Sequence, residues 1–82
     1  MRKQITSKVR IEARKAVQSE MKNLYARQKA LGLSDIRVAR YIGISRPYIA
    51  RLRKGGKWEN VKAYTLFAFR ECILHFEQNL KE

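Results

Sequence analysis

The sequence predicts an all-α fold, and three observations support this. Apolar residues recur at intervals of three and four, alternation with a two-residue period is never sustained, and the only proline lies within a helical stretch rather than at a hairpin. The 82 residues suffice for one small domain with a thin core, and they contain no repeat, linker or low-complexity tract. We therefore expect residues 1–82 to form a single domain of four to five helices, with long helices at both ends.

The first helix is expected to begin after Thr6 or Ser7, whose hydroxyls can accept hydrogen bonds from the first turn, and to end before Gly32. Its inward stripe consists of Val9, Ala13, Ala16, Val17, Met21, Leu24 and Leu31. The opposite face is basic, and we interpret it either as a solvated surface or as a contact with a nucleic-acid backbone. Residues 1–20 are thus a basic N-terminal extension together with the start of this helix.

Two short helices are expected next. Ser34 has the position of an N-cap for a helix of about eight residues, and Gly43 allows a tight turn after it. Ser45 caps the following helix, where Pro47 is tolerated because the first turn leaves its backbone nitrogen without a helical partner. The inward side chains of the pair are Val38, Ala39, Ile42, Ile49 and Leu52. This arrangement predicts a helix-turn-helix over residues 34–55.

The last segment is expected to form a helix over about residues 60–80, with Trp58 folded over the core. One apolar stripe, expected to pack on the helix-turn-helix, consists of Val61, Tyr64, Thr65 and Ala68. A second stripe has the spacing of a coiled-coil seam and consists of Leu66, Phe69, Ile73, Phe76 and Leu80. It can be covered by a second copy, which makes residues 60–80 a candidate dimer interface, or by residues 1–20 of the same chain.

The charge indicates the class of partner. Nineteen Lys and Arg against seven Asp and Glu leave a net charge of +12, which favours a polyanion such as nucleic acid. The segment from Arg37 to Lys57 contains seven basic residues and no acidic residue. Such a surface repels itself, but it is what a phosphate-facing surface requires, because each contact releases condensed counterions.

The stretch "GLSDIRVARYIGISRPYIARLRKG" resembles the Cro-type, lambda-repressor-like helix-turn-helix family of phage and bacterial transcriptional regulators, with Ala39, Gly43 and Ser45 at the family spacing. The resemblance covers residues 21 to about 68. It implies a lambda-repressor-like fold and sequence-specific binding of double-stranded DNA, as in a phage or plasmid repressor. There are two departures: Asp35 stands where the family often has a phosphate-contacting glutamine, and the family seldom has a proline at the place of Pro47.

An α-helix fits the major groove of B-DNA, and its outward residues in the first two turns reach base edges. The expected base-reading residues are Arg46, Pro47, Tyr48 and Arg51. Pro47 would touch a thymine methyl group, and Tyr48 could instead be a partly buried residue that packs within the protein. The expected DNA-backbone contacts are Ser34, Arg37, Ser45, Arg53, Lys54 and Lys57. A homodimer would place two reading helices about 34 Å apart on a palindromic operator.

Other classes of function have less support in the sequence. One cysteine and one histidine make neither a disulfide nor a zinc site, and we expect no metal, cofactor or small-molecule ligand. No carboxylate pair, Cys/His dyad or glycine-rich phosphate loop indicates an enzyme. No signal peptide or membrane span is evident, so we expect the cytoplasm, at the nucleoid or in a phage host. Two rival functions remain: a helix-turn-helix that binds another protein, such as an antitoxin or a phage-encoded inhibitor, and a membrane-surface peptide.

Overall fold

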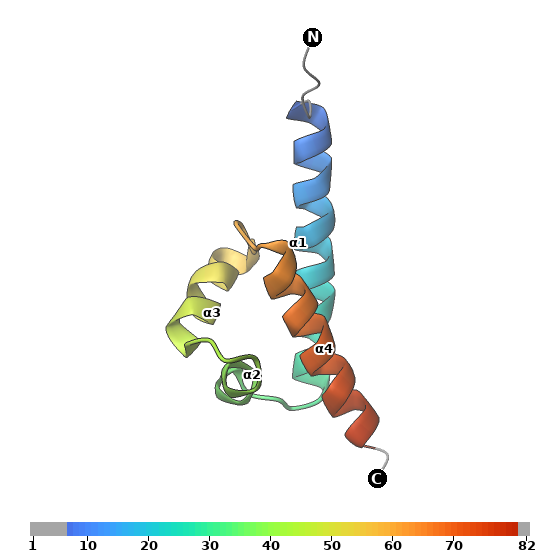
Figure 1. The fold of residues 1–82 in the computed structure, drawn as a ribbon, viewed down its shortest axis with the longest axis vertical. Coiled ribbons are helices and arrows are strands. Elements are labelled where there is room, and N and C mark those ends of the chain that lie inside the picture. Colours follow the sequence, from blue (N-terminus) through green and yellow to red (C-terminus); the bar gives the residue numbers. More distant parts are fainter. Residues whose placement is uncertain (1–6, 81–82) are drawn as a thin grey trace.

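The computed structural model describes residues 7–80, which are almost entirely helical (Figure 1). This part of the chain contains no strand, so the prediction of an all-α fold is confirmed. Four α-helices and one short 3-10 helix follow in order: α1 (Ser7–Ala30), α2 (Asp35–Ile42), α3 (Arg46–Arg53), η1 (Lys54–Gly56) and α4 (Ala63–Asn79).

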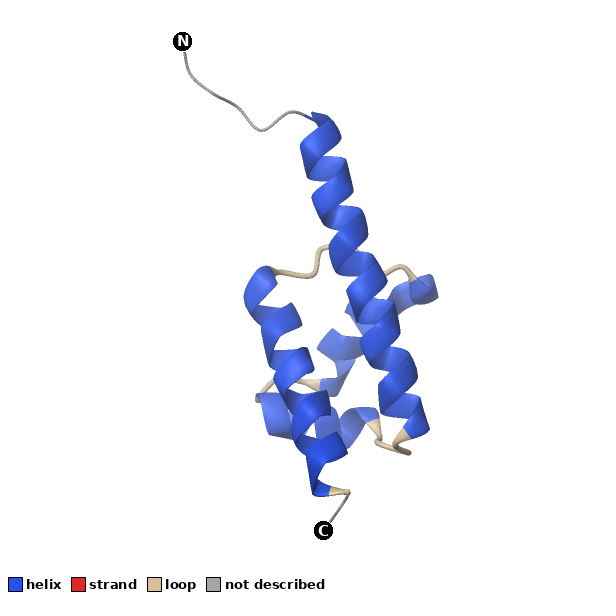
Figure 2. Ribbon diagram, turned by 90° about the vertical axis from the view of Figure 1, so that its right-hand side faces the viewer, coloured by secondary structure: helices blue, strands red, loops and turns tan. Residues whose placement is uncertain are grey.

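The two long helices, α1 and α4, lie side by side in one layer, and α2 and α3 lie behind them (Figure 2). Two ion pairs join the long helices: Glu20 with Arg70 at 2.7 Å and Arg27 with Glu77 at 2.6 Å. Both pairs link residues 50 positions apart, so the helices run in the same direction and a residue of α1 is level with the residue of α4 numbered 50 higher. Since α4 begins at Ala63, the turns of α1 before Ala13 extend beyond it (Figure 1).

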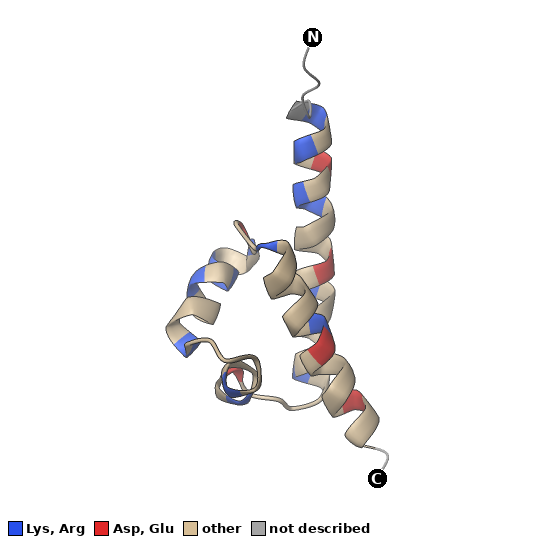
Figure 3. Ribbon diagram, in the orientation of Figure 1, with Lys and Arg blue, Asp and Glu red and all other residues tan. Residues whose placement is uncertain are grey.

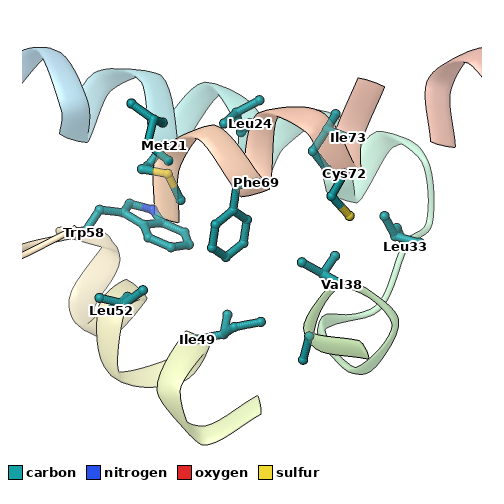
Figure 4. Close-up of a cluster of buried hydrophobic side chains, with 12 residues drawn as sticks. Met21, Leu24, Leu33, Val38, Ile49, Leu52, Trp58, Phe69, Cys72 and Ile73 are labelled. Carbon is teal, nitrogen blue, oxygen red and sulfur yellow. The ribbon is translucent and has the colours of Figure 1, made fainter. Parts of the chain in front are cut away.

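The core lies between the two layers (Figure 4). Trp58, only 2 % exposed, contacts Tyr25 and Phe69 edge to face, with ring centroids 5.9 and 6.1 Å away. The prediction that Trp58 folds over the core is confirmed. The buried apolar residues are Met21, Leu24, Leu33, Val38, Ala39, Ile49, Leu52, Trp58, Leu66, Phe69, Cys72 and Ile73.

Local sequence signals set the ends of the short helices. The Ser34 hydroxyl accepts a hydrogen bond from the backbone N–H of Arg37, which confirms the predicted N-cap. Gly43 ends α2 in the left-handed region, with φ 88°, and its N–H donates to the carbonyl of Ala39. Three residues, 43–45, therefore separate α2 from α3.

The apolar stripe predicted for the first helix is buried only in its second half. Met21 and Leu24 are almost inaccessible, whereas Val9, Ala13 and Ala16 are exposed. Val9 lies on the turns of α1 that extend beyond α4. The helix is already formed at Ser7, and the alternative start at Thr6 lies outside the described residues.

The predicted start of the last helix is wrong by three residues. Trp58 and Asn60 have φ values of 52° and 62°, which a right-handed helix cannot include, so α4 begins at Ala63. Tyr64 is also 70 % exposed, whereas the first stripe was expected to pack inward.

The prediction of a dimer interface on the second stripe is wrong for three of its five residues. Leu66, Phe69 and Ile73 are at most 9 % exposed and lie in the core of a single chain. Phe76 is half-buried and Leu80 is 70 % exposed. Leu66, Phe69 and Ile73 are thus covered within the chain by α1, where Val17 packs against the same core, and by the short helices.

Candidate nucleic-acid interface

The outer face of α3 is an exposed basic surface. The Ser45 hydroxyl caps α3 by accepting a hydrogen bond from the N–H of Tyr48 at 3.2 Å, and Pro47 occupies the first turn. The inner face is anchored by Ile49 and Leu52, which are 0 % and 5 % exposed. This anchoring directs the other side of the helix to solvent, at the edge of the molecule farthest from α1 (Figure 1).

Three of the four predicted base-reading residues lie on this outer face. Arg46, Pro47 and Arg51 are exposed, and neither arginine makes an ion pair with any described residue. Tyr48 is half-buried and packs against the core, so its side chain is only partly available. Neither end of the described chain covers this face (Figure 1).

The basic surface continues beyond the end of α3 (Figure 3). Gly55 and Gly56 have positive φ values of 63° and 72°, which turn the chain sharply after Lys54. Arg51, Lys54 and Lys57 line one groove between the end of α3 and the following loop, together with Glu59 and Asn60 among others. The two predicted backbone-contacting lysines are therefore close to a predicted base-reading arginine.

Arg53 has a different role from the DNA-backbone contact predicted for it. Its guanidinium donates to both carboxylate oxygens of Asp35, at 3.0 and 2.5 Å, and its charged carbon lies 4.6 Å from the centre of the Tyr25 ring. The prediction for Arg53 is wrong, because this guanidinium is bound within the fold.

Asp35 is held by more than Arg53. The side-chain amide of Gln28, which is 4 % exposed, donates to the Asp35 carboxylate at 2.8 Å and to the Leu33 carbonyl at 2.9 Å. The hydrogen bond from Arg53 lowers the pKa of Asp35, and the bond from Gln28 lowers it further, against the opposing effect of burial. The charge of this carboxylate is therefore largely neutralised by its own chain.

This network was not found from the sequence. The one sequence feature that could have indicated it is that Asp35 is the only acidic residue between Glu20 and Glu59. A lone carboxylate in a basic segment suggests a structural partner, but its partner is 18 residues away, and only the packing of α2 against α3 identifies it.

The start of α2 contributes two further predicted backbone contacts. Ser34 and Arg37 are both exposed, and the Ser34 hydroxyl can still donate its proton while accepting the capping bond. The guanidinium carbon of Arg37 lies 5.1 Å from the centre of the Phe76 ring, which leaves its charge without a carboxylate partner in the described chain.

The described residues were also examined for a metal site, a reactive thiol and a membrane-spanning helix. Among them, no cluster of three or more His, Cys, Asp or Glu side chains could hold a metal ion. Cys72 is fully buried, and desolvation raises the pKa of its thiol to about 11. No described helix is both long enough and apolar enough to cross a membrane.

The chain was also compared with known proteins. No protein-family model, curated protein or solved structure matches it.

Proposed function

We propose that the chain is a sequence-specific DNA-binding transcriptional regulator of the lambda-repressor-like helix-turn-helix type, which inserts α3 into the major groove. The observation that carries the proposal is the division of α3 into two faces. Ile49 and Leu52 anchor one face in the core, whereas Arg51 on the other face and Arg46 at the start of the helix are exposed and make no ion pair with a described residue. A rigidly held helix with free guanidinium groups matches the shape and hydrogen-bonding pattern of the major groove.

The charges around α3 support the same function. The described residues from 36 to 58 contain no carboxylate side chain, and Asp35 at the edge of this surface is paired with Arg53. A phosphate approaching the start of α2 therefore meets the exposed Arg37 and the Ser34 hydroxyl rather than an unpaired carboxylate. This removes the repulsion that Asp35 would otherwise cause.

The residues then divide by role. Arg46 and Arg51 read base edges in the DNA. On the protein, Arg51 lines the same surface groove as Lys54 and Lys57. Pro47 offers an apolar contact, and Tyr48 acts mainly as a packing residue at the rim. The backbone contacts are Ser34, Arg37, Ser45, Lys54 and Lys57. Bound at a promoter, such a protein represses by occlusion, as a phage or plasmid repressor acting in the cytoplasm of a host would.

Selection of bound sequences from random duplex DNA tests the proposal and should yield a defined motif. Arg51→Ala should lose about 1–3 kcal/mol at one base pair and relax the preference there. Lys54→Ala should weaken binding to all sequences alike. The slope of the logarithm of the binding constant against the logarithm of salt concentration should become shallower by about one, the value of one phosphate contact. These two exposed residues line the same groove, so each serves as the control for the other. Selection that yields no motif would refute the proposal.

A second candidate, a module that binds another protein, has one observation in its favour. Tyr41 is 47 % exposed and contacts the rings of His75 and Phe76, at centroid distances of 5.0 and 5.6 Å. Tyr41 and His75 have no part in the DNA contacts proposed above, although Phe76 lies beneath the guanidinium of Arg37. DNA binding that does not depend on sequence, together with a protein ligand whose binding is lost in Tyr41→Ala, would favour this candidate.

A further inference from the structure

A pocket of about 380 Å³ lies between α1 and the loop that leads into α4. Small-molecule sites in proteins typically have volumes of roughly 300–1,000 Å³, so the pocket has a suitable size for such a ligand. Its lining comes from two segments, residues 13–17 and 58–62, which only the fold brings together, and the sequence therefore does not indicate it. The lining residues are Ala13, Arg14, Val17, Trp58, Asn60, Val61 and Lys62. None of them is among the DNA contacts proposed above.

The lining has an apolar part and a cationic part. The cations are Arg14 and Lys62, which are both exposed and make no ion pair with any described residue. No carboxylate of the described chain lines the pocket, so its positive charge is not balanced locally. The apolar lining residues are Ala13, Val17, Trp58 and Val61.

The indole N–H of Trp58 donates no hydrogen bond to any described residue, although Trp58 is only 2 % exposed. Every inaccessible side-chain nitrogen or oxygen of the described residues has a hydrogen-bond partner, so the unbonded indole nitrogen belongs to the small part of Trp58 that solvent reaches. Figure 4 shows this nitrogen on the edge of the ring that faces α1, where Ala13 and Val17 line the pocket. A buried donor is thus directed into the pocket without an acceptor.

The start of α4 adds further donors beside the pocket. This helix of 17 residues begins after Lys62 without a side-chain cap. Its first backbone hydrogen bond runs from the N–H of Leu66 to the carbonyl of Lys62, so the three N–H groups between them have no acceptor within the helix. They are level with residues 13–15 of α1, given the offset of 50 between the two helices. The positive end of the helix dipole therefore adds to the charges of Arg14 and Lys62.

We propose that this pocket binds a small carboxylic acid with an apolar body, in its ionised form. The carboxylate accepts a hydrogen bond from the Trp58 indole and pairs with Arg14 or Lys62, and the apolar body covers Val17 and Val61. Inorganic phosphate would satisfy the donors but leave the apolar lining uncovered. An uncharged apolar molecule would leave the indole N–H and both cations unpaired. The inference does not depend on the DNA-binding function proposed above.

Trp58 provides a direct assay, because it is the only tryptophan of the chain and its indole N–H gives a single signal in NMR of the ¹⁵N-labelled protein. The full chain is titrated with hexanoate, phenylacetate and 4-phenylbutanoate in about 150 mM salt, which screens weak attraction to the basic surface. The indole signal should move saturably. For 4-phenylbutanoate, with about 12 non-hydrogen atoms, we expect a dissociation constant of about 1 mM or lower. The neutral 4-phenylbutanamide should bind at least tenfold more weakly.

Variants locate the binding to this pocket. Arg14→Gln and Lys62→Gln each remove one charge at an exposed position, and each should raise the dissociation constant of 4-phenylbutanoate at least fivefold. Lys15→Gln is the matched control, because it removes the same charge from the exposed neighbour of Arg14, which does not line the pocket, and it should change the constant by less than twofold. Trp58→Phe keeps an aromatic ring but removes the N–H, and should weaken binding at least fivefold as followed by the backbone signal of Val61. Unchanged circular dichroism shows that the variants are folded.

Several results would overturn the proposal. Absence of a saturable shift with all three acids would exclude the site, and equal binding of the acid and its amide would exclude recognition of the carboxylate. Equal losses in Lys15→Gln and Arg14→Gln would show that the acids are attracted only by the net charge of the protein. Inorganic phosphate that binds as tightly as 4-phenylbutanoate would contradict the apolar body of the ligand. None of these results bears on DNA binding.

Discussion

The ion pair between Asp35 and Arg53 joins the start of α2 to the end of α3, and Asp35→Asn should weaken the fold mainly through this contact. The substitution preserves size and one carbonyl oxygen, but it leaves the Arg53 guanidinium without its counter-charge. The paired side chains are only 21 % and 24 % exposed, so water replaces the lost contact incompletely. Arg53 also remains against the Tyr25 ring, where its charge is partly desolvated.

The size of the effect follows from this partial burial. Removing a partner from a fully buried pair costs about 3–5 kcal/mol, and a hydrogen bond to a charged group contributes about 1.5–3 kcal/mol. Because this pair is mostly but not fully buried, we expect a loss of about 2 kcal/mol in the free energy of unfolding. In a domain of this size the midpoint of thermal unfolding should then fall by roughly 8–15 °C.

Urea unfolding at pH 7, followed by circular dichroism, measures the effect, and Glu20→Gln is the control. The Glu20–Arg70 pair has a similar distance, but its side chains are 37 % and 40 % exposed, so its loss should cost less than about 1 kcal/mol. Equal losses in the two variants would refute the reasoning that burial makes the Asp35–Arg53 pair important.

The same pair should make the free energy of unfolding decrease at low pH. Because Arg53 and Gln28 lower the pKa of Asp35 in the folded state, its stabilising contribution is complete above the unfolded pKa of about 3.9 and is lost as the pH falls through the lower folded value. Between pH 5 and pH 2.5 the wild type should therefore lose more stability than Asp35→Asn. Parallel curves for the two proteins would contradict this assignment.

Three further predictions concern the core and the turns. Cys72 is fully buried with its pKa raised to about 11, so at pH 8 a thiol reagent should label it only as fast as the protein unfolds; labelling at the rate of a free peptide would show an accessible thiol. Gly43→Ala should cost about 1–2 kcal/mol in urea unfolding because of the φ of 88° alone, since no atom lies within 4 Å of the added carbon, and Gly43→Asn should cost less. Ser45→Ala should cost about 1 kcal/mol by removing the cap of α3, and no change would mean that the bond to Tyr48 is not formed in solution.

The short helices were predictable because their ends depend on neighbouring residues. Ser34, Gly43 and Ser45 act on backbone groups no more than four positions away, so the sequence identifies them without knowledge of the fold. The exposed face of α3 follows in the same way, since placing Ile49 and Leu52 inward directs Arg46 and Arg51 outward. Local hydrogen bonding and helical periodicity are thus sufficient for this part of the candidate site.

Contacts between distant residues decided the rest. The last helix carries apolar side chains on several sides, and periodicity cannot say which of them meet α1; packing buried Phe69 and Ile73 and left Tyr64 and Phe67 exposed. Likewise, the sequence predicts that Arg53 contacts DNA together with the other basic residues. In the structure Arg53 pairs with Asp35, 18 residues away in the chain, and is therefore not available to DNA. Which apolar side chains are buried and which charged side chains form ion pairs depends on which segments meet in space. Only the tertiary structure contains that information.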